Sequence, residues 1–397
     1  MDTEVNNLFS QLHNDADHID TSWQEPLRFS LRDSAHRQAL RELIDTGSVI
    51  AIRDNIKEAV QELYDIEYPH EKDLLVKTKF DEFQRAFDEE YGTWVYFPWS
   101  RYLVRFPEQS DLRKLRTSRN RDLVTEQEQQ RLYDASVAVF GLSVGSNVVD
   151  SLLLQGIGGT LIVADMDYLE PSNLNRIRAP YQDVGLSKID NIAKRISETD
   201  PYIVQVHYHD GLTEHNLEEI MNTHRPAVLV DEMDQLEMKV KLRQRARRAA
   251  VAVISAADDG NDTLVDIERY DLDHDKALFN GIIPADILQR IERGEVRDRK
   301  MLGMMIGRYF IGPDHIPLRM FQSLDRVGKT LPSWPQLGGA AVLAGVVSAY
   351  CARQIILGKP LREGRYVIGP ESTLSLEHED DEHQTALSDY RNKLGSL

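Results

Sequence analysis

One short segment gathers amide groups and cations in a chain whose overall charge is strongly negative. Residues 173–190 read NLNRIRAPYQDVGLSKID, in which Asn173, Asn175 and Arg176 come first and Lys188 follows a turn. The whole chain carries a formal net charge of -18. Arginine offers a rigid fork of N–H donors that matches phosphate oxygens, and lysine adds a compact positive charge. The segment therefore predicts a site for an anion with several oxygens.

Glycines and acids at expected strand ends extend this prediction. Gly141 and Gly145 lie in a GLSVGS loop between a strand and a helix, where backbone N–H groups bind phosphate well. Asp165 ends the next strand, 24 residues after Gly141, where an acid can reach ribose hydroxyls. Asp234 follows a later strand, and a carboxylate there suits Mg²⁺, which binds one or two acids together with phosphate oxygens. Together these residues indicate ATP with Mg²⁺.

Strands alternate with helices through the middle of the chain. The expected strands cover 136–141, 160–167, 203–210, 227–234 and 251–258. The expected helices cover 146–156, 188–201, 217–224 and 237–250. This alternation predicts an α/β fold with a doubly wound, Rossmann-like and mostly parallel sheet. The carboxyl ends of such strands meet at one crevice, which would bring the glycine loop and the acids together.

The pattern outside this region predicts a second, smaller domain and two further features. Residues 1–115 show helical spacing of apolar residues, with a strand or hairpin at 93–106, and predict a mainly helical N-terminal domain. Residues 116–397 form the second domain, which opens with a helix capped by Thr125. A long helix of small residues is expected at 338–358, and a terminal hairpin at 365–377.

Composition excludes several classes of protein. A single cysteine, Cys351, rules out a disulfide framework and a four-cysteine zinc site. The acidic balance argues against nucleic-acid binding, because like charges repel the phosphate backbone. No apolar run is expected to reach the roughly 18 residues that span a bilayer, so no membrane contact is predicted. The N-terminal residues 1–15 lack the basic start and apolar centre of a signal peptide, which predicts a cytoplasmic protein.

Each of these features has a simpler interpretation when it is taken alone. The GLSVGS loop matches GxGxxG poorly, because Ser143 replaces the second glycine, so it could be a plain tight turn. Asp165 could simply end a strand, and Lys188 could begin a surface helix. Their occurrence together at successive strand ends favours ATP. A nicotinamide-dependent oxidoreductase and a catalytically silent, nucleotide-binding regulatory scaffold are the alternatives.

At these residues the sequence resembles the ThiF/MoeB adenylating superfamily, which includes the catalytic domains of ubiquitin-activating enzymes. The resemblance covers about 119–270, and more loosely 338–358, and rests on the pattern D-x-D, SNLNR, G-x-x-K and D. It implies that Asp165 binds ribose, that Asn173, Arg176 and Lys188 contact the nucleotide and its phosphates, and that Asp234 is linked to the metal. It also implies that Arg119 or Arg121 enters the site of a neighbouring subunit, and hence a homodimer.

The resemblance implies a reaction as well as a fold. A substrate carboxylate, at the C-terminus of a peptide or small ubiquitin-like carrier protein, would attack ATP to form an acyl-adenylate and release pyrophosphate. Arg176, Lys188 and Asp234 are the expected catalytic residues. The sequence departs from the family's usual GxGGxG loop, and no cysteine lies at the position of a thioester-forming residue. In these respects it is similar to a bacterial subgroup with an extra N-terminal region.

Overall fold

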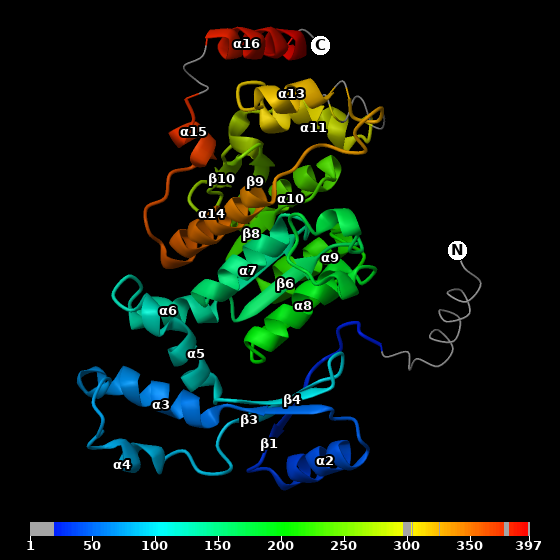
Figure 1. The fold of residues 1–397 in the computed structure, drawn as a ribbon. Coiled ribbons are helices and arrows are strands. Elements are labelled where there is room, and N and C mark those ends of the chain that lie inside the picture. Colours follow the sequence, from blue (N-terminus) through cyan, green and yellow to red (C-terminus); the bar gives the residue numbers. More distant parts are fainter. Residues whose placement is uncertain (1–19, 297–302, 304, 325, 377–380, 396–397) are drawn as a thin grey trace, which may run out of the picture. The chain divides into compact units, whose positions relative to one another are not determined.

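The computed structural model describes residues 20–296, 303, 305–324, 326–376 and 381–395 (Figure 1). The chain divides into two compact units, residues 1–112 and 113–397, where the sequence pattern placed the division at 115/116. The stretch 1–15, which was searched for a signal peptide, lies outside the described residues.

The N-terminal unit combines helices with a mixed four-stranded sheet. Its strands follow the order β1-β3-β4-β2, in which β2 runs parallel to β4 and the other pairs are antiparallel. The hairpin expected at 93–106 is confirmed as β3 and β4, but the sequence pattern missed β1 and β2, which are only four residues long. The elements are β1 (Leu27–Ser30), α2 (Ser34–Asp45), β2 (Ala51–Asp54), α3 (Ile56–Glu67), α4 (Phe80–Gln84), β3 (Thr93–Phe97) and β4 (Tyr102–Phe106).

The second unit is built on a seven-stranded sheet with the order β11-β10-β9-β8-β5-β6-β7. The five strands from β9 to β7 are parallel, and β10 and β11 are added antiparallel at one edge. This order is doubly wound, as predicted, and the chain switches direction between β5 and β8. The strands are β5 (Ser136–Phe140), β6 (Thr160–Ala164), β7 (Val204–Tyr208), β8 (Val228–Asp231), β9 (Ala252–Asp259), β10 (Asp262–Glu268) and β11 (Gly364–Ile368).

Helices cover both faces of this sheet. Residues of α6, α7, α8 and α14 form one core with alternate strand residues, and α9, α10 and α11 form a second core on the opposite face. Parallel strands buried on both faces read as continuous apolar runs, which explains why SVAVF and TLIVA were recognised. The helices are α5 (Gln109–Thr117), α6 (Glu126–Asp134), α7 (Gly145–Gln155), α8 (Lys188–Thr199), α9 (Glu214–Glu219), α10 (Leu236–Ala249), α11 (Ala285–Glu292), α13 (Leu318–Leu324), α14 (Gly338–Leu357), α15 (Pro370–Leu374) and α16 (Asp381–Gly395).

The long helix α14 corrects one expectation from the sequence. By length and composition it is apolar enough to cross a membrane, because Arg353 is its only charged residue. Its residues nevertheless pack in the core beside α7, β9 and β10. A Cβ atom on Gly345 would lie 2.4 Å from the carbonyl oxygen of Asn147, so only glycine allows α14 to approach α7 this closely. The packing is that of a core helix.

The C-terminal region also differs from the expectation. Residues 364–368 form a strand, but it pairs with β10 rather than in a terminal hairpin. The second half of the expected hairpin is the short helix α15, which begins at Pro370, because proline is favoured in the first turn of a helix. The carboxylate of Asp262 accepts hydrogen bonds from the backbone N–H groups of Glu371 and Ser372, which fixes the start of this helix.

Candidate functional site

The predicted site residues of the second unit lie at the carboxyl ends of its parallel strands. The glycine loop follows β5, Asp165 follows β6, and Asp234 follows β8, which is the neighbour of β5 on the other side. This is the edge of a doubly wound sheet where ligands bind, beside the point at which the strand order reverses.

Asp165 connects the glycine loop to the end of β6. One carboxylate oxygen accepts a hydrogen bond of 2.5 Å from the backbone N–H of Leu142, and the other accepts one of 2.7 Å from Asp167. The side chain is buried, and burial raises its pKa although the charge of Lys188 opposes the shift. A buried acid fixed by two backbone donors is held rigidly at the strand end.

Lys188 lies beside this acid because it opens α8. The hydroxyl of Ser187 caps the helix by accepting a hydrogen bond from the backbone N–H of Asp190. The ammonium Nζ of Lys188 is 2.6 Å from Asp167 and 3.9 Å from Asp165. The lysine side chain is buried, whereas that of Asp167 is 64% exposed. An incoming phosphate could therefore replace Asp167 as the partner of the lysine without breaking a buried contact.

Arg176 contacts the glycine loop directly. Its Nε donates a 3.0 Å hydrogen bond to the hydroxyl of Ser143, and its Nη1 donates to the side chain of Asn175 and the carbonyl of Ser172. We define Asp165, Asp167, Arg176 and Lys188 as the strand-end cluster. It consists of two cations and two carboxylates, of which Arg176 and Asp165 contact the glycine loop directly.

The two asparagines of the predicted segment support its backbone. The buried side chain of Asn173 accepts a hydrogen bond from the backbone N–H of Glu170 and closes the turn before Arg176. The side chain of Asn175 donates to the carbonyl of Gln336, just before α14. A Cβ atom on Gly338 would lie 2.0 Å from the carbonyl of Asn175, so α14 begins directly against this segment. Their visible role is to position Arg176.

Both glycines of the loop are required by close packing. Gly141 has a φ of +84°, and a Cβ atom there would lie 2.5 Å from the carbonyl oxygen of Glu232. A Cβ atom on Gly145 would lie 2.9 Å from the side chain of Val139. The GLSVGS loop thus keeps glycine where the backbone of β8 and the start of α7 come close, although it departs from GxGxxG.

Acids at the ends of β8 and β9 complete the site. Asp234 is exposed, while Asp231 is buried and paired with Arg243 and Lys239. Asp258 is the penultimate residue of β9 and accepts a 3.1 Å hydrogen bond from Gln336. Burial raises the pKa of Asp258 and the charge of Asp234 adds to the shift, while Gln336 and Arg176 oppose it.

Mg²⁺ fits this donor set only in combination with a nucleotide. Among the described residues, no group of three or more His, Cys, Asp or Glu side chains is arranged to hold a metal ion. Asp234 follows β8 and Asp258 lies near the end of the neighbouring strand β9, and two carboxylates are the small protein contribution that Mg²⁺ needs beside phosphate oxygens and water. These two residues would hold the ion.

Arg121 is not brought to the strand-end cluster of its own chain. The neighbouring Asn120 donates hydrogen bonds to Gln129 and to the carbonyl of Gln155, at the C-terminal end of α7. The glycine loop lies at the other end of this helix, roughly 15 Å away for a helix of this length. Arg119 and Arg121 are both exposed. Either could contribute to a nucleotide site only in a second copy of the chain.

Sequence reasoning missed three polar residues at this site. Asp167 is the second acid of the D-x-D pattern, Ser143 lies inside the glycine loop, and Asp258 is the last but one residue of the strand AVISAADD. The rule that strand ends converge on one crevice applied to Asp258 as much as to Asp234. Gln336 had no such signal, because it reaches Asp258 from a loop far along the chain.

Comparison with known proteins gives matches over part of the chain. Residues 117–294 match the ThiF family. An uncharacterized protein of Mycobacterium tuberculosis (strain CDC 1551 / Oshkosh) is 34% identical over 292 residues, which are 72% of this chain and 39% of that protein. Ubiquitin-like modifier-activating enzyme 5 of Drosophila mojavensis is 33% identical over 96 residues, 24% of each chain. The tRNA threonylcarbamoyladenosine dehydratase of Escherichia coli (strain K12) is 30% identical over 140 residues, 35% of this chain and 52% of that one. The chain thus spans about half or less of these relatives.

Solved structures resemble the chain at lower identity. The crystal structure of the E. coli tRNA N6-threonylcarbamoyladenosine dehydratase, TcdA, has a TM-score of 0.45 and 21% identity, and the match covers 63% of this chain and 98% of that one. E. coli MccB with ATP has a TM-score of 0.45 and 15% identity, with 79% and 83% of the two chains covered.

Proposed function

The chain carries a ThiF-family domain at residues 117–294, and on this premise we propose that the protein is an ATP-dependent adenylyltransferase. Its substrate is a carboxylate, which it activates as an acyl-adenylate. The single observation that carries the proposal is the place of Asp165 and Lys188. The acid is bonded to the glycine loop at Leu142, and the lysine lies 3.9 Å from it at the start of the next helix. Acid, loop amides and cation match the ribose and phosphates of a nucleotide.

In the proposed reaction the protein mainly positions the two substrates and stabilises negative charge on the phosphates. A carboxylate oxygen of the substrate attacks the α-phosphorus of ATP. The bond from that phosphorus to the bridging oxygen breaks, and its electron pair leaves with pyrophosphate. Arg176 donates to Ser143 in the glycine loop and Lys188 lies beside Asp165, and both stabilise the negative charge that develops on the phosphate oxygens. Asp234 and Asp258 would hold Mg²⁺, which would supply further neutralisation of the charge on the phosphates.

The substrate class rests on the family and on the modifier-activating relatives. We propose the C-terminal carboxylate of a peptide or small carrier protein. An external nucleophile then consumes the adenylate, because Cys351, the single cysteine of the chain, is buried and burial raises its pKa to about 12. A thiol in that state is inert as a nucleophile at neutral pH.

The proposed enzyme works as a homodimer in the cytoplasm, with Arg121 of one copy completing the site of the other. Mixing inactive Arg121→Ala and Lys188→Ala variants tests this, since each mixed dimer then has one intact site. Recovery of about a quarter of wild-type activity is expected for random exchange of subunits. No recovery, together with a monomeric mass by light scattering, would overturn the dimer proposal.

ATP–pyrophosphate exchange tests the proposed activity. A library of peptides with free C-termini should contain sequences that stimulate exchange, and the same peptides with amidated C-termini should not, because the attacking oxygen is lost. Exchange stimulated equally by both would refute the proposed carboxylate chemistry. ATP binding without exchange for any carboxylate would instead favour the silent regulatory scaffold.

A further inference from the structure

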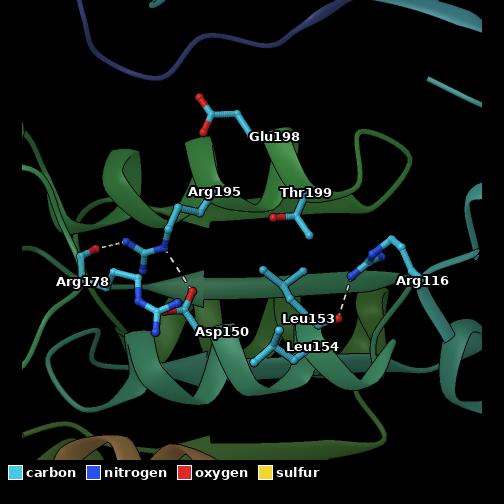
Figure 2. A pocket seen from close by; sticks show the side chains of 8 residues that line it. All are labelled: Arg116, Asp150, Leu153, Leu154, Arg178, Arg195, Glu198 and Thr199. Carbon is cyan, nitrogen blue, oxygen red and sulfur yellow. Dashed lines mark hydrogen bonds and ion pairs between the residues drawn. The ribbon is translucent and has the colours of Figure 1, made fainter. Parts of the chain in front are cut away.

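A second polar cavity lies between α7 and α8, away from the strand-end cluster. It has a volume of about 290 Å³ and is lined by arginines from three segments, Arg116, Arg178 and Arg195, with Asp150 and Leu154 beside them (Figure 2). Three guanidinium groups around one small cavity are unusual in a protein of net charge -18. The proposed adenylation uses none of them.

Arg195 leaves one hydrogen-bond donor unused at this cavity. Its Nε is 3.0 Å from Asp150, and its Nη1 donates to the carbonyl of Arg178. Its Nη2 is buried and has no hydrogen-bond partner among the described residues. Burial lowers the pKa of Arg195, and the nearby charge of Arg178 acts in the same direction. A buried guanidinium N–H without an acceptor is costly, so an acceptor supplied by a ligand would be stabilising.

Arg178 adds a cation that no protein group neutralises in the described part of the chain. Its side chain is exposed, and it makes no hydrogen bond or ion pair within the ranges that the structure covers. Its backbone, in contrast, is fixed, because the side chains of Arg195 and Asn191 both donate to its carbonyl. The guanidinium of Arg178 therefore lies on a rigid segment and can still bind an anion.

The other polar groups of the cavity are already satisfied or point elsewhere. Arg116 donates 2.6 Å hydrogen bonds to Asp200 and to the carbonyl of Leu153, which makes it part of the wall. Asp150 is neutralised by its ion pair with Arg195. Glu198 points away from the arginines in Figure 2. The positive charge that remains is that of Arg178, next to the unused N–H of Arg195.

We propose that this cavity binds a small oxyanion, a phosphate or a carboxylate, through Arg178 and Nη2 of Arg195. Guanidinium groups bind both anions through paired N–H donors. The side chains of Leu153 and Leu154 line the same cavity and can cover a compact apolar group attached to the anion.

This site is separate from the proposed nucleotide site. Leu154 lies nine residues along α7 from Gly145, which is roughly 13 Å of helix. Arg176, two residues before Arg178, instead donates to Ser143 in the glycine loop. Anion binding in the cavity therefore does not depend on whether the protein is an adenylyltransferase.

Titration calorimetry with inorganic phosphate and with malonate tests the proposal on the full chain. At least one of the two anions should bind saturably, and Arg178→Gln should weaken that binding at least tenfold. Binding of phosphate or of malonate alone identifies the natural ligand as a phosphate or a carboxylate. The absence of saturable binding by both anions up to about 20 mM would overturn the proposal.

Two control variants locate the binding. Arg248→Gln removes another exposed arginine, on α10 and outside the cavity, and should leave the affinity unchanged. Lys188→Gln should leave the affinity of the cavity unchanged and should alter only a separate binding event at the strand-end cluster. An affinity that falls in Lys188→Gln and not in Arg178→Gln would show that the anion occupies the nucleotide site and would refute the cavity assignment. Arg178→Gln should melt like the wild type, because its side chain is exposed.

Discussion

Two clusters in the second unit both combine carboxylates with an arginine, but their charged groups find their partners in different ways. The first, here called the buried charge network, consists of Asp231, Arg243, Glu268 and Tyr270. Arg243 is 1% exposed and pairs with Asp231 at 2.5 Å and with Glu268 at 2.7 Å. Its guanidinium also lies 4.0 Å from the ring centroid of Phe279. Glu268 accepts further hydrogen bonds from Tyr270 and from the backbone of Phe279.

In the strand-end cluster, some of the partners of the charged groups are exposed to solvent. Lys188 pairs with Asp167, whose side chain is 64% exposed, and Arg176 bonds to groups of its own segment and to Ser143. Burial alone would raise the pKa of Asp231, but Lys239 and Arg243 hold it below its usual value, whereas the pKa of Asp165 is raised. In the buried charge network every charged group has buried hydrogen-bond or ion-pair partners within the protein. In the strand-end cluster an exposed partner can be replaced by a ligand. This difference, rather than the number of charges, separates the two.

Breaking the buried charge network should have the largest effect. Arg243→Met should reduce the free energy of unfolding by about 3–5 kcal/mol, because it leaves the carboxylate of Glu268 buried without its cation and Asp231 with Lys239 alone. Urea denaturation measures this loss. A variant that unfolds at the same urea concentration as the wild type would show that the network is not structural.

Altering the strand-end cluster should reduce activity and leave stability almost unchanged. Lys188→Gln should lower ATP–pyrophosphate exchange by about 10- to 100-fold, since a charge-assisted hydrogen bond contributes about 1.5–3 kcal/mol. Its melting temperature should change little, because the pairing with Asp167 is exposed on one side. Lys241→Gln is the matched control, since Lys241 is paired with Glu214 and Glu237 and lies on α10. Equal activity of both variants would remove Lys188 from the site.

The parts of the fold and of the site that could be predicted from the sequence are those that depend on residues close together in the chain. The parallel strands and their helices were recognised from local apolar runs, and Asp165, Lys188 and the glycine loop were brought together as the topology requires. Strands β1 and β2 carried no comparable run. The contact of Gln336 with Asp258 joins residues 78 positions apart in sequence, and no periodicity encodes it. The burial of Arg243 likewise has no local signal, because its two acids come from β8 and β10.

Asp259 offers a third case, a buried carboxylate without a partner. It is 4% exposed, and one of its oxygens has no hydrogen-bond partner among the described residues. Burial raises its pKa to about 7 from an ordinary value near 3.8, with Asp262 and Glu371 adding to the shift. The folded protein thus keeps a proton that the unfolded chain loses, so this group makes stability fall as the pH rises from about 4 to 7.

Asp259→Asn should remove this contribution. The variant should be more stable than the wild type by about 1–3 kcal/mol at pH 8, and the difference should shrink at pH 5, where the wild-type carboxyl is protonated. Urea unfolding at both pH values gives the difference. An advantage of the variant that is the same at both pH values would mean that the carboxyl does not titrate in this range.

The smallest effect is expected at Cys351. Its side chain is buried in α14 among small residues, so Cys351→Ala should cost about 1 kcal/mol of stability through packing. Exchange and overall product formation should persist, because the thiol takes no part in the proposed reaction. Loss of turnover, or a reducible adduct between substrate and wild-type enzyme, would make the cysteine catalytic.

Titration calorimetry of the wild-type protein with MgATP and with NAD tests the central claim most directly, because it asks which ligand completes the strand-end cluster. ATP should bind with a saturable isotherm, and Lys188→Gln should weaken this binding at least tenfold, while Lys241→Gln leaves it unchanged. NAD should bind far more weakly, since it offers no triphosphate to Arg176 and Lys188. Tight binding of NAD without binding of ATP would contradict the account.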